Sequence, residues 1–105
     1  MIDRKKQLNL LGLALRASFL IHGDESVEKA VKRKKVRCII IANDISQATM
    51  ERYQRFSQTY DVPLINRFNR LEISQAIGKS RSICGITDKG LSDKFLSYET
   101  GEEYI

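Results

Sequence analysis

Apolar and polar positions follow one another along the chain in blocks of changing period, and each change predicts the end of a helix or strand. Leu8, Leu11 and Leu15 recur at helical spacing, so we expect a helix there. The run from Val36 to Ala42 is nearly continuous and rich in β-branched residues, which is typical of a strand covered on both faces. In chain order the pattern predicts helix 4–17, strand 19–21, helix 24–34, strand 36–42, helix 47–60, strand 63–67, helix 70–77, strand 82–87 and helix 89–97.

Residues that favour helix ends lie at several of these boundaries. Asp3 and Ser46 are placed to cap the helices that follow them. Asn69 and Glu72 have the spacing of a capping box, and Gly78 suits the position just after that helix. These local signals support the predicted boundaries independently of the hydrophobic pattern.

The alternation of helices and strands predicts the fold class. It indicates an α/β fold in which helices cover both faces of a small sheet. A chain of 105 residues is long enough for one modest core and too short for two. We therefore expect a single domain over residues 1–97, and a polar, frayed tail at 98–105.

The segment around the expected helix 24–34 carries most of the functional information. A helix start offers unpaired backbone N–H groups and the positive end of the helix dipole, which suit a phosphate or the edge of a nucleobase. Gly23 precedes this start, so a ligand can approach the backbone closely. At 100° per residue, one side of this helix carries the apolar residues Val27, Ala30 and Val31. The opposite side carries a polar stripe of Glu25, Lys29 and Arg33.

Charge favours a polyanionic partner. The net charge is +5, with 18 Lys and Arg against 13 Asp and Glu, although a soluble protein that is merely basic remains an alternative. The cations at 32–35, with Arg37, exceed what a helix end needs, so phosphate contact is preferred over a solvated helix end or an import signal. A second basic group lies further along, and its position relative to the first is left open: Arg67, Arg70, Lys79 and Arg81.

Catalytic and metal chemistry find little support. His22 is the only histidine and is interpreted as a half-buried residue at a strand end, while the carboxylates at 24–28 are explained by the helix dipole. Cys38 and Cys84 lie in apolar runs without zinc spacing, as buried thiols do in a reducing compartment. We expect no catalytic residues, metal or cofactor, and hence no enzyme.

The apolar stretch 8–15 is broken and is shorter than a membrane span, so we expect a cytoplasmic protein.

Aromatic residues bear on the kind of nucleic acid. Tyr53, Phe56 and Tyr60 fall on the inward face of their helix, so we expect no exposed aromatic suited to stacking on bases. Folded RNA is therefore preferred over a single strand as the partner.

Taken together, these segments resemble a known family, the kink-turn-binding ribosomal proteins, and within it the bacterial YlxQ-like branch. The resemblance covers roughly residues 5 to 96. It implies a three-layer α/β/α sandwich with a four-stranded mixed sheet. The residues that carry it are 8–14, Gly23, Lys29, Arg33, 38–44, Val62-Pro63 and 76–81.

The resemblance also implies how RNA is recognised. In the family motif Gly-x-Asn-Glu-x-x-Lys, at the start of the second helix, the asparagine and glutamate read sheared G·A pairs of a kinked RNA. Gly23 and Lys29 match this motif, whereas Glu25 and Ser26 replace its asparagine and glutamate. A carboxylate only accepts hydrogen bonds, whereas an amide also donates, so recognition of a standard kink-turn is affected more than the fold.

Further positions follow from the same resemblance. Arg33 falls on an arginine that meets the RNA backbone, Arg70 on a basic position near the RNA, and 79–83 on a loop that covers an extruded nucleotide. The full set of expected RNA-binding residues is Gly23, Asp24, Glu25, Ser26, Lys29, Lys32, Arg33, Arg70, Lys79, Ser80 and Arg81.

These observations predict a non-enzymatic, monomeric protein that binds structured RNA, foremost ribosomal RNA, and neither DNA nor a membrane. Two alternatives stay open. One is an accessory domain related to the RNA-binding domains of ribose methyltransferases. The other is a protein-interaction module whose basic face meets an acidic partner.

Overall fold

The computed structural model describes residues 3–100, in which helices and strands alternate as the hydrophobic pattern predicts. Every expected element is present, and boundaries differ mainly in that the strands are shorter. The elements are α1 (Arg4–Arg16), β1 (Leu20–His22), α2 (Asp24–Lys32), β2 (Cys38–Ile41), α3 (Gln47–Tyr60), β3 (Leu64–Ile65), α4 (Arg70–Ile77), β4 (Ile83–Ile86) and α5 (Lys89–Thr100).

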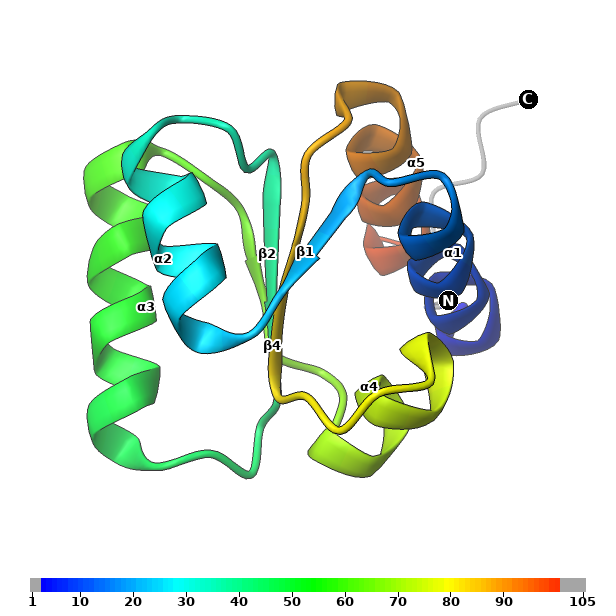
Figure 1. Ribbon diagram of the computed structural model, residues 1–105, viewed down its shortest axis with the longest axis horizontal. Coiled ribbons are helices and arrows are strands. Elements are labelled where there is room, and N and C mark those ends of the chain that lie inside the picture. The colour runs from blue at the N-terminus through cyan, green and yellow to red at the C-terminus, as the bar shows by residue number, and fades with distance from the viewer. Residues whose placement is uncertain (1–2, 101–105) are drawn as a thin grey trace.

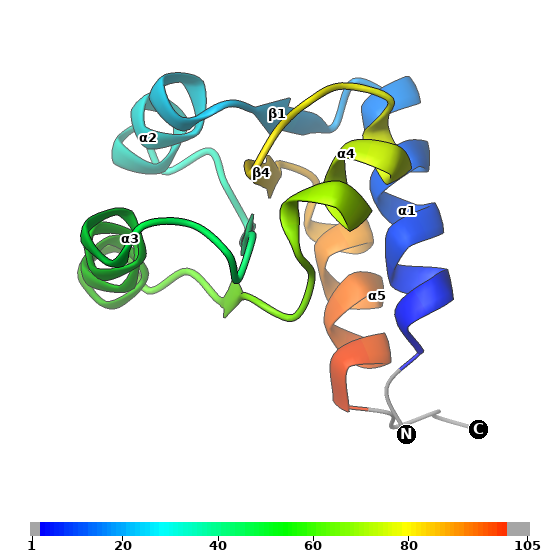
Figure 2. The same cartoon turned by 90° about the horizontal axis from the view of Figure 1, so that it is seen from below.

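The strands form one mixed sheet in the order β1-β4-β2-β3. Strand β4 is antiparallel to both of its neighbours, whereas β2 and β3 are parallel. Helices α2 and α3 cover one face of the sheet, and α1, α4 and α5 cover the other (Figures 1 and 2). The expected three-layer α/β/α sandwich with a four-stranded mixed sheet is confirmed.

Burial of β2 on both faces explains its unbroken apolar sequence. Ile39 and Ile41 pack in the cluster beneath α2 and α3, whereas Cys38 and Ile40 pack in the cluster beneath the other three helices. The cysteines are free and buried, and burial raises the pKa of the Cys38 thiol to about 12 and also raises that of Cys84. These thiols act as small apolar side chains, as their sequence context suggests.

The predicted caps are present. Backbone N–H groups donate to the side chains of Asp3 and Ser46, and Asn69 with Glu72 forms a complete capping box. Gly78 ends α4 with a φ of 73°, in the left-handed region that glycine adopts at little cost. Local sequence therefore sets most of the helix boundaries.

The C-terminal boundary was predicted wrongly, because α5 continues to Thr100 where a frayed tail was expected from residue 98. The carbonyl of Tyr98 accepts a hydrogen bond of 3.2 Å from the backbone N–H of Asp3. Glu99 accepts one of 3.0 Å from the buried Gln7 and pairs with Arg67. These contacts with distant segments hold the last turn in place, and residues 101–105 of the expected tail lie outside the described residues. Within 3–100, no helix is both long enough and apolar enough to cross a bilayer.

Candidate nucleic-acid interface

The start of α2 is shaped by Gly23. This residue has φ 93° and ψ 143°, a conformation that is essentially restricted to glycine. Its N–H donates to the carbonyl of Ile83 at 2.9 Å, which ties the helix start to β4. Glycine has no side chain to cap the helix, so the first N–H groups of α2 face outward and are available to an anion.

The two sides of α2 divide as the sequence predicts. Val27, Ala30 and Val31 are buried against the sheet and α3. The opposite stripe is exposed, and its members Glu25 and Lys29 form a surface ion pair at 3.5 Å. Such an exposed pair is weak, so both side chains are free to exchange partners.

Asp24 is engaged by α3. Arg52 donates to its carboxylate at 2.8 and 2.5 Å, and the Tyr53 hydroxyl donates to it at 2.8 Å. Arg52 also donates to Glu28 at 2.6 Å, and these bonds hold the pKa of both carboxyl groups below their usual values. The helix dipole alone therefore does not account for the acidic first turn. Asp24 offers the interface its backbone N–H rather than its side chain.

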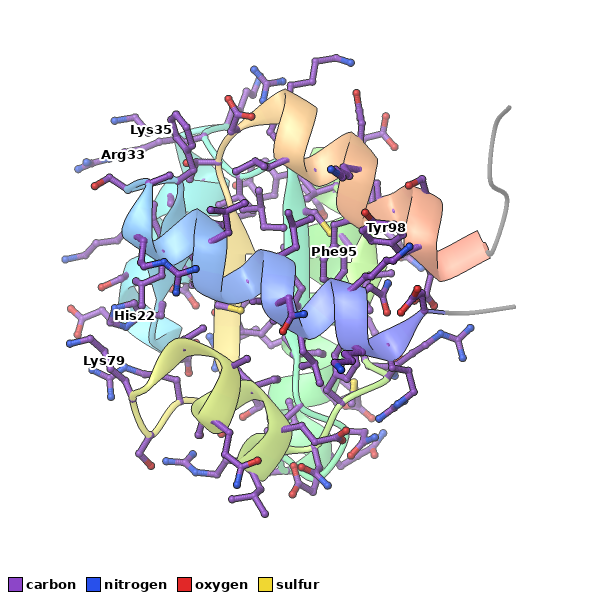
Figure 3. The ribbon with its side chains drawn as sticks, turned by 90° about the vertical axis from the view of Figure 1, so that its right-hand side faces the viewer. His22, Arg33, Lys35, Lys79, Phe95 and Tyr98 are labelled. Atoms are coloured by element: carbon purple, nitrogen blue, oxygen red, sulfur yellow. The ribbon has the colours of Figure 1, made fainter. Side chains whose placement is uncertain are left out.

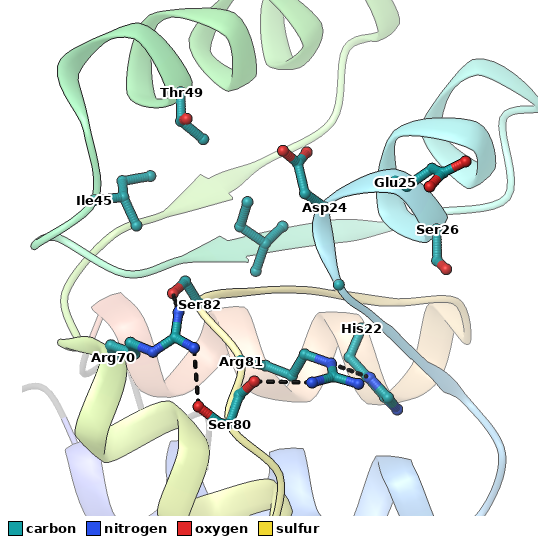
Figure 4. A pocket seen from close by; sticks show the side chains of 12 residues that line it. His22, Asp24, Glu25, Ser26, Ile45, Thr49, Arg70, Ser80, Arg81 and Ser82 are labelled. Carbon is teal, nitrogen blue, oxygen red and sulfur yellow. Dashed lines mark hydrogen bonds between the residues drawn. The ribbon is translucent and has the colours of Figure 1, made fainter.

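A pocket of about 520 Å³ lies between the start of α2 and the loop that joins α4 to β4 (Figure 4). We call it the α2 pocket. It unites the start of α2 with part of the second basic group, a relation that sequence spacing leaves open. Its lining includes many of the expected RNA-binding residues: Gly23, Asp24, Glu25, Ser26, Arg70, Ser80 and Arg81.

Arg70 forms one part of the wall opposite α2. Its guanidinium donates to the Ser80 hydroxyl at 2.8 Å and to the Ser82 hydroxyl (Figure 4). Its backbone N–H, at the start of α4, donates to the Asp44 carboxylate at 2.9 Å. The cation is thus fixed at both its backbone and its side chain.

Arg81 forms the rest of this wall. Its Nε donates to Nδ1 of His22 at 3.0 Å, and its Nη1 donates to the carbonyl of Ser80 at 2.9 Å. Burial lowers the pKa of His22, and the charges of Arg81 and Lys79 lower it further. The imidazole is therefore neutral at neutral pH and acts as an acceptor. His22 is the half-buried strand-end residue that the sequence suggests, with a positioning role that the sequence did not indicate.

The remaining expected residues lie outside the α2 pocket. Lys79 is exposed on the loop, and Lys29 follows Glu25 along the stripe. Lys32 pairs with Glu28 at 3.3 Å and lies over the Phe56 ring, so it is turned toward α3.

Arg33 lies at the far end of α2, and Figure 3 shows it next to Lys35 and away from His22 and Lys79. Arg67, from the second basic group, pairs with Glu99 and does not line the pocket.

Other lining residues were not expected from the sequence. Thr49 reaches the pocket from the first turn of α3 and Ile45 from the segment before it. Ile83 reaches it from the start of β4 and Ser82 from the residue before. Their side chains carry no signal that distinguishes them from ordinary turn, helix or strand residues. The prediction about aromatics suited to stacking considered α3 alone and did not include Phe19, which is 41% exposed. Phe19 lies in the connection before β1, where helical periodicity does not apply.

Comparison with known sequences identifies a family and two relatives that cover most of the chain. Residues 5–96 match the model of the ribosomal protein L7Ae/L30e/S12e/Gadd45 family. An RNA-binding protein YlxQ from Enterococcus faecium is 39% identical over 92 residues, which cover 88% of this chain and 89% of that protein. Its namesake from Bacillus subtilis is 29% identical and covers 84% of this chain and 89% of the relative.

Solved structures show the same architecture. A protein of unknown function from Bacillus halodurans C is 36% identical, with a TM-score of 0.85 over 89% of this chain and 95% of that one. A 15.5kD RNA binding protein from Giardia lamblia has a TM-score of 0.78 over 95% of this chain and 90% of that one. At 16% identity this second likeness bears on the fold alone.

Proposed function

Since the chain belongs to the ribosomal protein L7Ae/L30e/S12e/Gadd45 family, we propose that it is a non-enzymatic protein that binds structured, kink-turn-like RNA at the α2 pocket. Relatives that match most of its length bear the name RNA-binding protein. Ribosomal RNA is the partner that the family name favours.

One observation carries this proposal: a bare helix start faces two fixed arginines across one pocket. The N–H groups at the start of α2 and the guanidinium groups of Arg70 and Arg81 are hydrogen-bond donors that converge on the same space. A guanidinium has five N–H donors, and each of these arginines uses two of its nitrogen atoms on protein partners. The remaining donors are available for phosphate oxygens or the acceptor edges of bases.

Roles for individual residues follow from this geometry together with the family resemblance. Gly23 admits the RNA to the helix start, while Glu25 and Ser26 lie where base edges are read, next to Lys29. The loop from Lys79 to Arg81 covers a nucleotide that leaves the stack, and Arg70 meets the backbone beside it. Arg33 lies further along α2, where it meets phosphates of the continuing stem, whereas Lys32 is turned toward α3.

The chemistry of the pocket supports binding rather than catalysis. Its histidine directs Nδ1 to Arg81, and its serines at 80 and 82 accept hydrogen bonds from Arg70. Side chains engaged in this way position charge and are not set up as a nucleophile and its base. We further propose that the protein acts as a monomer on cytoplasmic RNA, with neither DNA nor a membrane as a partner.

A titration of the chain with a kink-turn RNA and a straight duplex of equal length tests the proposal. The kink-turn should bind more tightly, because only its splayed bases enter the α2 pocket. Affinity should fall with increasing salt, since lysines and arginines release counterions from the RNA. Equal affinity for the two RNAs would contradict recognition of a kinked element, and absence of binding to both would contradict RNA binding itself.

A further inference from the structure

A second hollow lies at the opposite end of α2 and β1 from the α2 pocket. It measures about 440 Å³ and is lined by Ser18, Ile21, Lys35, Arg37 and Thr87. We call it the distal hollow. Its cations belong to the dense basic run of the sequence, yet neither lines the α2 pocket. The proposed function therefore leaves them without a role.

The polar groups of the distal hollow are free. Among residues 3–100, no ion pair involves Lys35 or Arg37, and no side-chain hydrogen bond involves the hydroxyl of Ser18 or Thr87. No carboxylate lines the hollow. Asp88, which follows Thr87, uses its carboxylate to accept a hydrogen bond of 2.9 Å from the N–H of Leu91 in α5. Arg37 also borders an adjacent hollow that contains Asp61 and Asp93, and it forms no ion pair with either. Two cations and two hydroxyl groups, with no carboxylate in the lining, are side chains that bind phosphate oxygens.

The backbone around the hollow is held in place. The N–H of Lys35 donates to the carbonyl of Ala30 at 2.9 Å, and the N–H of Arg37 donates to the carbonyl of Ile86 at 2.7 Å. The N–H of Thr87 donates to the carbonyl of Phe19 at 2.9 Å. The segments that carry the charges and hydroxyls are thus anchored to α2, β4 and each other, so they form a fixed surface rather than loose loops.

The distance between the two sites fits one RNA. Helix α2 has nine residues, so its ends lie about 13 Å apart. At the B-form rise of about 3.4 Å per base step this length corresponds to about four steps, and to slightly more in an A-form RNA stem, whose rise is smaller. Figure 3 shows Arg33 and Lys35 at one end of the molecule's surface along α2, and His22 and Lys79 at the other end. The exposed cation Lys29 lies on α2 between the two sites.

We propose that the distal hollow is a second RNA-backbone site, which binds phosphates of the stem that continues from the RNA held in the α2 pocket. This inference rests on the proposed function. It extends the footprint on the RNA from the kinked element to one of its stems. The second site adds affinity and salt dependence and reads no sequence, because its contacts are to phosphates alone.

The test compares a short kink-turn RNA with versions in which one or the other stem is lengthened by about six base pairs, enough to pass the distal hollow. Each phosphate that is neutralised adds nearly one unit to the slope of log affinity against log salt. The parent protein should therefore show a slope steeper by about two units for one of the lengthened RNAs. Between about 50 and 200 mM salt, the advantage of that RNA over the short one should shrink roughly tenfold.

Variants assign the effect to the hollow. Lys35→Ala with Arg37→Ala should remove the extra slope and leave binding of the short RNA unchanged. Lys5→Ala with Arg55→Ala is the matched control, since both residues are exposed, line neither site and carry the same total charge. Thr87→Glu is a second test in case the double variant folds poorly. It adds a carboxylate without removing a cation, and it should also remove the extra slope.

The outcomes separate the inference from the proposed function. If the parent binds short and lengthened RNAs with the same slope, the distal site is wrong while binding at the α2 pocket stands. If the Lys35 and Arg37 variant weakens both RNAs equally, or no more than the control does, the hollow makes no specific contact and the inference fails. If the parent binds none of these RNAs, the proposed function fails and the inference fails with it.

Discussion

The two walls of the α2 pocket differ in how their side chains are held. On the wall from α4 and β4, Arg70 and Arg81 donate to Ser80, Ser82 and His22, so their charges are fixed before any ligand arrives. On the α2 wall, Glu25 is 86% exposed at its side chain, and its exposed partner Lys29 lies 3.5 Å away. One wall is preorganised and positive, whereas the other has exposed side chains and carries a carboxylate.

This difference suggests a division of labour. Fixed cations lose little conformational entropy on binding, so we propose that the rigid wall provides affinity for the backbone of a folded RNA. The α2 wall holds the residues at which the chain departs from the family motif, so we propose that it selects the bases. Only the backbone of the α2 wall is rigid, because Asp24 is anchored to Arg52 and Tyr53 behind it.

The largest effect is expected from the rigid wall. Arg70→Ala should weaken binding of a kink-turn RNA by about 2–3 kcal/mol, since it removes a charged donor and releases Ser80 and Ser82. Fluorescence titration at fixed salt measures this loss. Arg55→Ala, an exposed arginine on α3, is the control and should change affinity little. A similar loss in both variants would indicate general charge attraction and remove the distinction between the walls.

The α2 wall should respond in the opposite direction. Glu25→Asn with Ser26→Glu restores the family motif and should tighten binding to a standard kink-turn by on the order of 1–3 kcal/mol, because an amide both donates to and accepts from base edges. The same titration with a straight duplex is the control and should show no comparable gain. An equal gain for both RNAs would mean that these positions contribute charge rather than base recognition.

Gly23 joins the two walls, and its substitution tests the backbone of the site. Gly23→Val should lower the free energy of unfolding by about 1–2 kcal/mol, because a β-branched residue resists a φ of 93°. Space is not limiting, since the nearest atom to an added Cβ is Nε of Arg81 at 3.7 Å. Denaturant unfolding measures the loss. Gly78→Asn is the control, because its φ of 73° with ψ of 19° is a conformation that asparagine tolerates. Equal stability of the Gly23 variant and the parent would show that no backbone strain acts there.

His22 should give the smallest effect, as a pH dependence of the rigid wall. Its folded pKa lies below the ordinary value of about 6.5, so the neutral form is favoured by folding. The stability it contributes is complete above pH of about 6.5 and is lost as the pH falls through the lowered pKa, because protonated His22 no longer accepts from Arg81. Unfolding measured across this range should show the loss in the parent and a smaller one in His22→Asn. An imidazole that titrates at or above the ordinary value in NMR spectra would contradict this account.

How far sequence reasoning reaches differs between the fold and the site. Patterns that lie within one element, such as the buried face of α2 or the capping box of Asn69 and Glu72, were predicted because the chain itself sets their spacing. The bond from Arg81 to His22 and the anchoring of Asp24 by Arg52 join residues 59 and 28 positions apart, and no local pattern encodes them. The same limit explains why the last turn of α5, held by Gln7 and Arg67, was mistaken for a tail.

The most direct test of RNA binding at the α2 pocket is a map of backbone amide shifts by NMR as kink-turn RNA is added. We expect the largest changes at Gly23 to Ser26 and at Ser80 to Ser82, the two walls that line the pocket. Large changes confined to α1, α3 and α5, with both walls unmoved, would contradict the account and place the RNA elsewhere.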